Sequence, residues 1–463
     1  MQQTAAAGRT GVLGAAPGKG WRLTIVVGYA VLTAALVALA ATQGLVGVAA
    51  GVLIAAFIVL LAVLGSLRTA TLALMGAFAT APMYKGLAPA GAQVTPTDVL
   101  FVIGFALLLP HVINRRVSMP VSYVFGVSGI AIFGAIASTL SEESFLSFFA
   151  LVLWLVVLVP LPIAFALWMP SDRIIELLCW SYVAGHMVSW VGGMARGGVT
   201  TDGRYFGLTT HPNYFGQAAI MSIGLLLYLL FRYKTPLLRL AVLGAIGLCG
   251  VTILLSGSRG ATAVAAVLVL MIPIVERSAI TGFIFAIVGA IFLAALPLVV
   301  EVGSGTSAID RILGQGSASG SNQARTDGLQ SGVDRFWDSP LFGDGLIDLF
   351  DIHNNFLEVV VGIGLFGLVA YLLVLYAFAR PLLGDSPYRR LCYAAWIYIG
   401  WGAIVPSLYD RGVWAPIALS VVAVVTTTGR RPGDDGGDPV PDGAAGTDSD
   451  VPATTPVGGP QPV

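Results

Sequence analysis

The amino-acid sequence predicts an all-α integral membrane protein that crosses the bilayer about 12–14 times. Of its 463 residues, 57% are hydrophobic and only 10% are charged, whereas soluble domains carry about 25% charged residues. The apolar residues also fall into blocks, most of them roughly 17–25 residues long, which is the length of a bilayer-spanning helix. Because lipid offers the backbone no hydrogen-bond partners, each block is expected to be helical.

Fourteen blocks fit this description, although the third, fourth and tenth are short. The first follows three basic residues and is too long for a typical signal-peptide core, so we interpret it as an uncleaved anchor rather than a cleaved signal. The blocks lie near residues 23–41, 44–65, 69–83, 98–113, 119–139, 144–168, 174–195, 214–232, 236–255, 260–275, 280–300, 354–378, 391–408 and 412–428.

The loops carry unequal positive charge. With the N-terminus inside, sixteen Lys and Arg residues fall on the cytoplasmic side and eight on the outer side. Cytoplasmic loops of membrane proteins are the richer in Lys and Arg, so an even number of spans with both termini in the cytoplasm is predicted. This divides the chain into a cytoplasmic segment 1–22, a membrane domain 23–428 and a cytoplasmic tail 429–463. The tail has seven Pro, eight Gly, six Asp and no aromatic residue, which predicts disorder.

Two outer loops are long enough to carry chemistry, at about 196–213 and 301–352. The second is expected to be partly helical over 322–337. Seven of the eight outer basic residues are arginines, and the planar guanidinium favours phosphate or carboxylate. The diphosphate of a polyprenyl-linked sugar is one such target. The alternative is that these arginines pair with outer carboxylates or lipid headgroups. The arginines are Arg196, Arg204, Arg259, Arg311, Arg325, Arg335 and Arg411.

Three outer segments contain candidate site residues. Arg204 opens the stretch RYFGL and is followed by the triplet His211-Pro212-Asn213, which predicts a helix start capped by Asn213. The backbone amides of such a start could also receive an anion. Arg259 stands in a tight Ser-Arg-Gly turn between two spans.

In the third segment, His353 stands where the long loop enters the next span. Histidine titrates near neutral pH and can serve as a general base, and His211 is the second choice for that role. Two alternatives are a helix-capping histidine and a metal site formed with Asp348 and Asp351. The three cysteines lie in separate apolar blocks without metal-binding spacing, and we expect them to be buried.

Together these segments resemble the O-antigen ligase and O-antigen polymerase superfamily of bacterial membrane glycosyltransferases. His353-Asn354, nine residues, Gly364, two residues and Gly367 resemble that family's His-Asn motif, and residues 336–345 (FWDSPLFGDG) resemble the segment before it. The stretch from Arg204 to Leu208 and the Ser-Arg-Gly turn are similar to further family elements. The resemblance covers about residues 196–380.

The resemblance implies a metal-independent glycosyltransferase of the bacterial cytoplasmic (inner) membrane that needs no cofactor. Its donor would be a polyprenyl-diphosphate-linked glycan, and its acceptor a glycan, a lipid or a protein, at the surface of the lipid membrane. No nucleic-acid partner is indicated. We predict that His353 is catalytic. The residues expected to bind substrate are Arg204, Arg259, Arg325, Arg411, His211 and Asn354.

The competing function is a non-enzymatic polysaccharide exporter or a flippase for lipid-linked glycans. Few charges lie within the spans, Glu176 and Glu358 being the clearest, and this scarcity argues against an ion-driven pump. A transporter needs a polar path through the bilayer, whereas an enzyme needs only an outward-facing pocket. An outer cavity that unites Arg204, Arg259 and His353 would therefore favour the enzyme.

Overall fold

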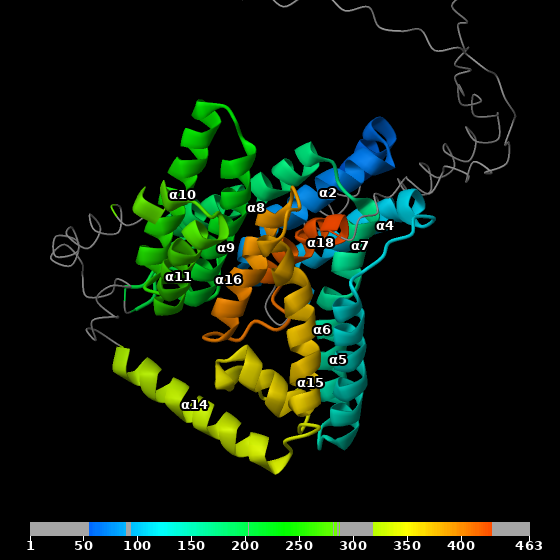
Figure 1. Cartoon of the computed structure of the whole chain (residues 1–463), viewed down its shortest axis with the longest axis vertical. Coiled ribbons are helices and arrows are strands. Elements are labelled where there is room, and N and C mark those ends of the chain that lie inside the picture. The colour runs from blue at the N-terminus through cyan, green and yellow to red at the C-terminus, as the bar shows by residue number, and fades with distance from the viewer. Residues whose placement is uncertain are drawn as a thin grey trace, which may run out of the picture.

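The computed structural model describes residues 55–88, 94–201, 203–280, 282–284, 287 and 318–427, and these form a bundle of helices (Figure 1). Extended pairing within this part is limited to an isolated bridge between Val199 and Tyr205. Six of its helices are long and apolar enough to cross a membrane, and four shorter apolar helices accompany them. The predicted class, an all-α multi-pass membrane protein, is confirmed.

The described helices begin and end as follows: α2 (Ser66–Thr80), η1 (Ala81–Met83), α3 (Tyr84–Leu87), α4 (Pro96–Val112), α5 (Val121–Leu140), α6 (Ser144–Leu158), α7 (Pro160–Trp168), α8 (Asp172–Arg196), α9 (Pro212–Arg232), α10 (Pro236–Ser256), α11 (Arg259–Val275), α14 (Ala318–Asp338), η2 (Phe350–Ile352), α15 (Asn355–Ala379), η3 (Arg380–Leu383), η4 (Arg389–Cys392), α16 (Tyr393–Gly402), α17 (Arg411–Leu419) and α18 (Val421–Thr427). Proline opens α4, α7, α9 and α10, where its missing N–H has no partner to lose.

Several sequence-based expectations fall outside the described residues: the segment 1–22, the span 23–41, half of the span 44–65, most of the span 280–300, the loop part 301–317 and the tail 429–463. One expected span ends earlier than its apolar block. The block 391–408 stops being helical at Gly402, because Pro406 disfavours helical backbone at the residue before it. The loop 403–410 that results leads into the candidate site.

The helix ends gather at two opposite faces of the bundle. At one face, Arg232 pairs with Asp172 and Glu176, and Arg389 and Arg390 both pair with Glu276 at 2.6 Å. This set joins loops that the charge pattern assigns to the cytoplasm. The 21-residue helix α9 separates it from the opposite face by about 30 Å. We call that opposite face the outer end, an assignment that rests on the charge bias.

Helix α15 is broken near its start. Ile363 (φ −132°, ψ 16°) and Gly364 (φ 71°, ψ −177°) interrupt the helical backbone. Figure 1 shows the first segment lying across the bundle, whereas the second runs alongside α5. A Cβ atom on residue 364 would lie 2.0 Å from the carbonyl oxygen of Leu341. Only glycine fits this conformation and this close approach.

The segment before α15 supplies hydrogen-bond partners for backbone groups of the broken helix. The amides of Asp344 and Gly345 each donate at 3.0 Å to carbonyls of the first segment, at residues 361 and 362, and the amide of Leu365 donates to Pro340 at 2.9 Å. Backbone groups freed inside a membrane protein need such partners. The spacing from His353 to Gly364 therefore sets the length of a short half-helix that begins at the outer end.

Helix α14 lies beside this half-helix, across the lower end of the bundle in Figure 1. Arg335 near its end holds the following loop in place. Its Nε donates to the Asp344 carboxylate at 2.9 Å, and its Nη atoms donate to the carbonyls of Ile347 and Asp348 at 3.2 Å. These contacts fix α14, and with it Arg325, over the outer end.

Candidate functional site

Arg204 ties two outer loops together. Its side chain is buried; Nε donates to the carbonyl of Ser256 at 3.0 Å, and Nη2 donates to Oδ1 of Asn213 at 3.0 Å. Ser256 ends α10, and Arg259 is the first residue of α11. The structure therefore brings Arg204 close to the turn that carries Arg259. These two contacts join Arg204 to the end of α10 and to the start of α9.

His211 caps helix α9. Its Nδ1 accepts a hydrogen bond from the amide of Asn213 at 3.1 Å, and Pro212 takes the first helical position. The expectation that Asn213 would be the cap is wrong: the helix begins two residues earlier than that cap would require, and the Asn213 side chain accepts from Arg204 instead. Because Nδ1 accepts, the hydrogen of the neutral ring lies on Nε2.

Positive groups surround His211. Loss of solvent around the ring, followed by the charges of Arg204, Lys85, Arg325 and His353, lowers the pKa of His211 to about 4. The ring is therefore neutral at neutral pH, and an extra positive charge at this position is unfavourable. Four segments that lie far apart in the sequence thus converge around one imidazole. We call Arg204, His211, Arg325 and His353 the histidine–arginine cluster; its positive field favours an anion.

His353 has the opposite hydrogen arrangement. Its backbone is left-handed (φ 58°), and its Nδ1 lies 2.7 Å from the carbonyl oxygen of Asp351. A carbonyl oxygen only accepts, so Nδ1 carries the hydrogen and Nε2 of the neutral ring is the accepting nitrogen. Of the two histidines in the cluster, His353 can therefore accept a proton at Nε2, whereas His211 offers an N–H donor there.

Asn354 holds His353 in position. Its Oδ1 accepts from the amides of Phe356 and Leu357 at 3.0 and 3.1 Å, and its Nδ2 donates to the carbonyl of Ala403 at 3.2 Å. Both ends of the amide are thus used within the protein, as in a helix N-cap. These contacts favour a positioning role, and substrate binding by Asn354 stays a prediction.

The structure gives no support to the alternative metal site. Within the described residues, no group of three His, Cys, Asp or Glu side chains is arranged to hold a metal ion. Asp348, Asp351 and His353 are therefore not such a group. Asp351 instead contributes its backbone carbonyl, which orients the His353 ring.

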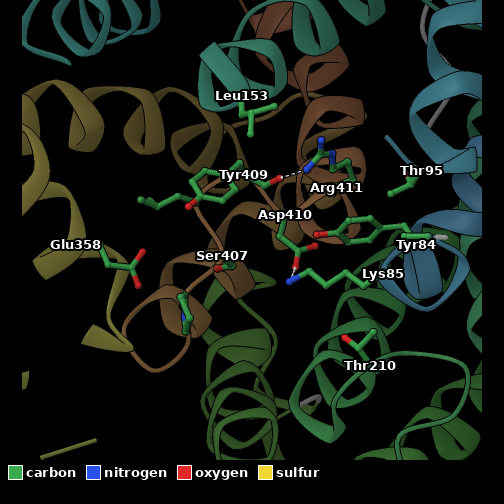
Figure 2. Close-up of a pocket in the computed structure, with 13 residues that line it drawn as sticks. Tyr84, Lys85, Thr95, Leu153, Thr210, Glu358, Ser407, Tyr409, Asp410 and Arg411 are labelled. Carbon is green, nitrogen blue, oxygen red and sulfur yellow. Dashed lines mark hydrogen bonds and ion pairs between the residues drawn. The ribbon is translucent and has the colours of Figure 1, made fainter. Parts of the chain in front are cut away.

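A cavity of about 360 Å³ opens beside the cluster (Figure 2). Thr210, the neighbour of His211, contributes to its wall, and Glu358 of α15 faces it from another side. Lys85 Nζ pairs with Asp410 at 3.3 Å and lies 3.4 Å from the ring centre of Tyr214. The cavity thus extends the candidate site from the cluster towards α3 and α15.

Arg411 lies at this cavity and not in the cluster's centre. Its Nε donates to the Asp98 carboxylate at 2.9 Å. For Arg411, as for Lys85 and Arg335, the alternative of pairing with an outer carboxylate describes the structure. Diphosphate binding by Arg411 stays a prediction that this ion pair weakens.

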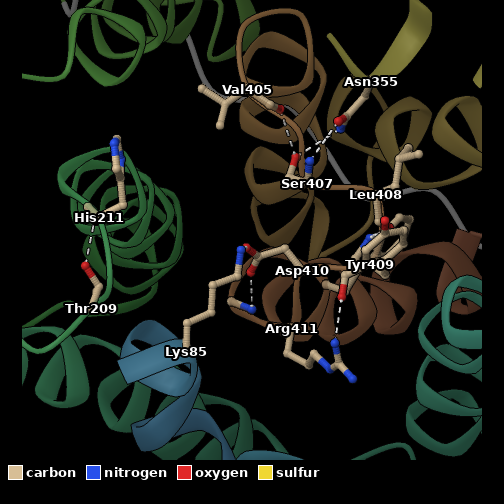
Figure 3. A network of polar contacts seen from close by, with 12 residues as sticks. Lys85, Thr209, His211, Asn355, Val405, Ser407, Leu408, Tyr409, Asp410 and Arg411 are labelled. Carbon is tan, nitrogen blue, oxygen red and sulfur yellow. Dashed lines mark hydrogen bonds and ion pairs between the residues drawn. The ribbon is translucent and has the colours of Figure 1, made fainter. Parts of the chain in front are cut away.

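Asn355 anchors the loop 403–410 that forms one cavity wall. Its Nδ2 donates to the hydroxyl of Ser407 at 3.0 Å, and its Oδ1 accepts from the Ser407 amide at 2.8 Å (Figure 3). Asn354 holds the same loop through Ala403. The two asparagines after His353 therefore join the base candidate, the half-helix and the cavity wall into one unit.

Residues 244–372 match the family model described as O-antigen ligase. This match supports the O-antigen ligase superfamily for this part of the chain. Arg259, Arg325, His353 and Glu358 lie within the matched range, and so do the half-helix and its glycine break. No curated protein matches the chain. The O-antigen ligase match supports glycan transfer, in a general sense, as the activity of this multi-pass membrane protein.

Sequence reasoning missed Lys85 and Asp410 and treated Glu358 only as an intramembrane charge. Lys85 shares the outer side with Arg411, and Glu358 follows Asn354 by about one helical turn. These two features were weak indications in the sequence. That Lys85, Glu358 and Asp410 line one cavity depends on tertiary packing between α3, α15 and the loop 403–410, which no spacing in the sequence encodes.

Proposed function

We propose that this chain transfers a glycan from a polyprenyl-diphosphate-linked donor to an acceptor hydroxyl, on the outer face of the bacterial cytoplasmic membrane. The observation that carries the proposal is the convergence of Arg204, Arg325 and His353 around the neutral His211. A field of this sign suits a diphosphate. A histidine with an accepting nitrogen in the same cluster suits the removal of a hydroxyl proton.

In this proposal Nε2 of His353 takes the acceptor's hydroxyl proton as the hydroxyl oxygen attacks the anomeric carbon of the donor. The new bond joins that carbon to the acceptor oxygen. The bond to the phosphate oxygen breaks, and its electron pair leaves with the lipid diphosphate. Arg204, Arg259 and Arg325 stabilise the negative charge of the leaving group. A diphosphate neutralised in this way needs no general acid.

His211 has a different part in the proposal. Its Nδ1 is used by the helix cap, so the ring offers only the Nε2–H group to a ligand. We assign that group to a phosphate oxygen of the donor, next to the first amides of α9, which add a partial positive charge.

Reconstitution tests the proposal. The full-length protein in liposomes is supplied with a polyprenyl-diphosphate oligosaccharide of defined structure and a panel of acceptors, among them the donor itself. Release of free polyprenyl diphosphate together with a glycosylated product is the expected result. Movement of the intact donor across the bilayer without release would instead support the flippase.

A further inference from the structure

Glu358 is a buried polar group that the proposed reaction does not use. Its side chain is 3% exposed, and within the described residues its Oε1 has no hydrogen-bond partner. A buried oxygen without a hydrogen-bond partner lowers the free energy of unfolding by about 1–3 kcal/mol, so Glu358 does not serve stability. Glu358 lies on the half-helix, five residues after His353, and faces the open cavity (Figure 2).

The rest of the cavity wall suits a sugar. Thr95, Thr210 and Ser407 contribute hydroxyl groups, and Tyr84 and Tyr409 contribute aromatic rings. A volume of about 360 Å³ falls in the usual range of small-ligand sites, about 300–1,000 Å³. A hexose offers hydroxyls to such donors and acceptors, and the faces of its ring can lie against aromatic side chains.

The charges of the cavity disfavour an anion. Its two cations, Lys85 and Arg411, are each already paired with a carboxylate, Asp410 and Asp98. Glu358 adds a further carboxyl group, so an anionic ligand would find no uncompensated positive charge here. The histidine–arginine cluster beside it has the opposite character. The site is therefore divided into a region for phosphate and a region for an uncharged ligand.

We propose that this cavity binds an uncharged sugar ring and that Glu358 binds its hydroxyl groups through the unpartnered oxygen. The proposal rests on the proposed function for the origin of that ring, which belongs to the donor glycan or to the acceptor. In either case Glu358 places the ring near His353, because Glu358 follows His353 by five residues on the half-helix that begins beside it. A carboxyl group accepts from a hydroxyl in either protonation state.

Direct sugar binding tests the proposal without glycan transfer. The full-length protein in lipid nanodiscs is studied by saturation-transfer NMR with neutral methyl hexosides and with the methyl glycoside of glucuronic acid. We expect saturation of at least one neutral hexoside and several-fold weaker saturation of the glucuronide. Glu358→Ala should reduce binding of the neutral sugar about tenfold, which is the upper end of the effect of losing one hydrogen bond.

Two further variants control this result. Glu142→Ala removes an exposed carboxylate from the turn between α5 and α6 and should leave sugar binding unchanged. Leu153→Trp fills the cavity from α6 and should abolish binding even if Glu358→Ala does not fold. The proposal is overturned if no neutral hexoside binds, if the glucuronide binds as well, or if folded Glu358→Ala or Leu153→Trp binds normally.

Kinetics then identify the origin of the sugar. A raised KM for the donor in Glu358→Ala assigns the ring to the donor glycan, and a raised KM for the acceptor assigns it to the acceptor; unchanged values of both would contradict the proposal. Failure of the proposed function has a separate signature. If the protein binds a neutral hexoside through Glu358 but never releases polyprenyl diphosphate, the sugar site is supported and the transferase activity is rejected.

Discussion

The two histidines of the outer end differ in the position of one hydrogen, and this difference divides their roles. His353 presents an accepting Nε2 because its Nδ1–H bonds to Asp351, whereas His211 presents an N–H because its Nδ1 accepts from Asn213. Both backbone contacts are local. They fix the tautomers before any substrate arrives, which is the arrangement that proton transfer requires.

We predict that His353→Asn slows transfer by about 10²–10⁴-fold, the usual effect of removing a positioned base. Asparagine tolerates the left-handed backbone of this position, so the variant should fold. Release of polyprenyl diphosphate in a single turnover measures the rate, and the donor concentration dependence should be near that of the parent. Activity within a fewfold of the parent, in a protein that unfolds at the parent's temperature, would reject the assignment and make His211 the next candidate.

We predict that His211→Asn keeps helix α9 capped but binds donor more weakly, because Asn supplies the capping oxygen and lacks the Nε2–H. His211→Ala should in addition lose about 1 kcal/mol of stability with the cap. Donor binding and thermal unfolding measure the two effects. Equal donor affinity in His211→Asn and the parent would contradict the phosphate contact.

The same residue gives a pH prediction. The pKa of His211 in the fold, about 4, is below the ordinary value of about 6.5. Between these values the unfolded chain binds a proton that the folded protein does not, so this contribution is present above about pH 6.5 and is lost as the pH falls towards 4. Unfolding temperatures measured from pH 7 to pH 4.5 should therefore fall more steeply in the parent than in His211→Asn. Parallel curves would show that the pKa is not lowered.

We predict that replacing either Arg204 or Arg259 by lysine slows transfer, for a different reason in each case. Arg204→Lys cannot keep both bonds, to Ser256 and to Asn213, and should lose about 1–3 kcal/mol of stability. Arg259 is half-buried at the start of α11, so Arg259→Lys should cost less stability while losing the bidentate geometry for phosphate. Thermal unfolding and donor KM distinguish the two variants. Near-normal turnover of both would count against diphosphate binding at these positions.

At the scale of elements, the half-helix of α15 depends on a single backbone position. Gly364→Ala would place a methyl group 2.0 Å from the Leu341 carbonyl and force a positive φ on alanine. We predict a loss of more than about 2 kcal/mol together with most of the activity, because the half-helix carries Glu358 and begins beside His353. Gly247→Ala, in α10, meets no atom within 4 Å and is the matched control. A Gly364→Ala protein as stable and active as Gly247→Ala would show that the break is not required.

The elements also show how far the sequence alone reaches. Apolar blocks predict helices well because lipid leaves the backbone no alternative, and the His353 motif stands out because its members are neighbours in sequence. The break at Gly364 depends on a partner from elsewhere, the segment 339–345, and the path of the loop after α16 depends on Asn355. The cavity joins Lys85, Glu358 and Asp410 across more than 300 residues, a distance over which spacing carries no information.

At the scale of the whole molecule, the two ends of the bundle are chemically different. One end closes on ion pairs such as those of Arg389 and Arg390 with Glu276. The outer end carries the histidine–arginine cluster and the cavity, with α14 lying beside the half-helix. This asymmetry fits a reaction confined to one side of the membrane, and it makes the orientation of the chain a functional question.

We predict that the end carrying α14 faces outward, because the loops at the opposite end hold most of the Lys and Arg. Single cysteines at two exposed sites test this in intact cells: Ser331→Cys on α14 and Thr235→Cys between α9 and α10. The native cysteines Cys179, Cys249 and Cys392 are buried, so background labelling should be low. A membrane-impermeant maleimide should label Ser331→Cys at once and Thr235→Cys only after permeabilisation. The reverse pattern would show that the histidine–arginine cluster faces the cytoplasm. It would then reject glycan transfer on the outer face, because the site would lie on the other side of the membrane.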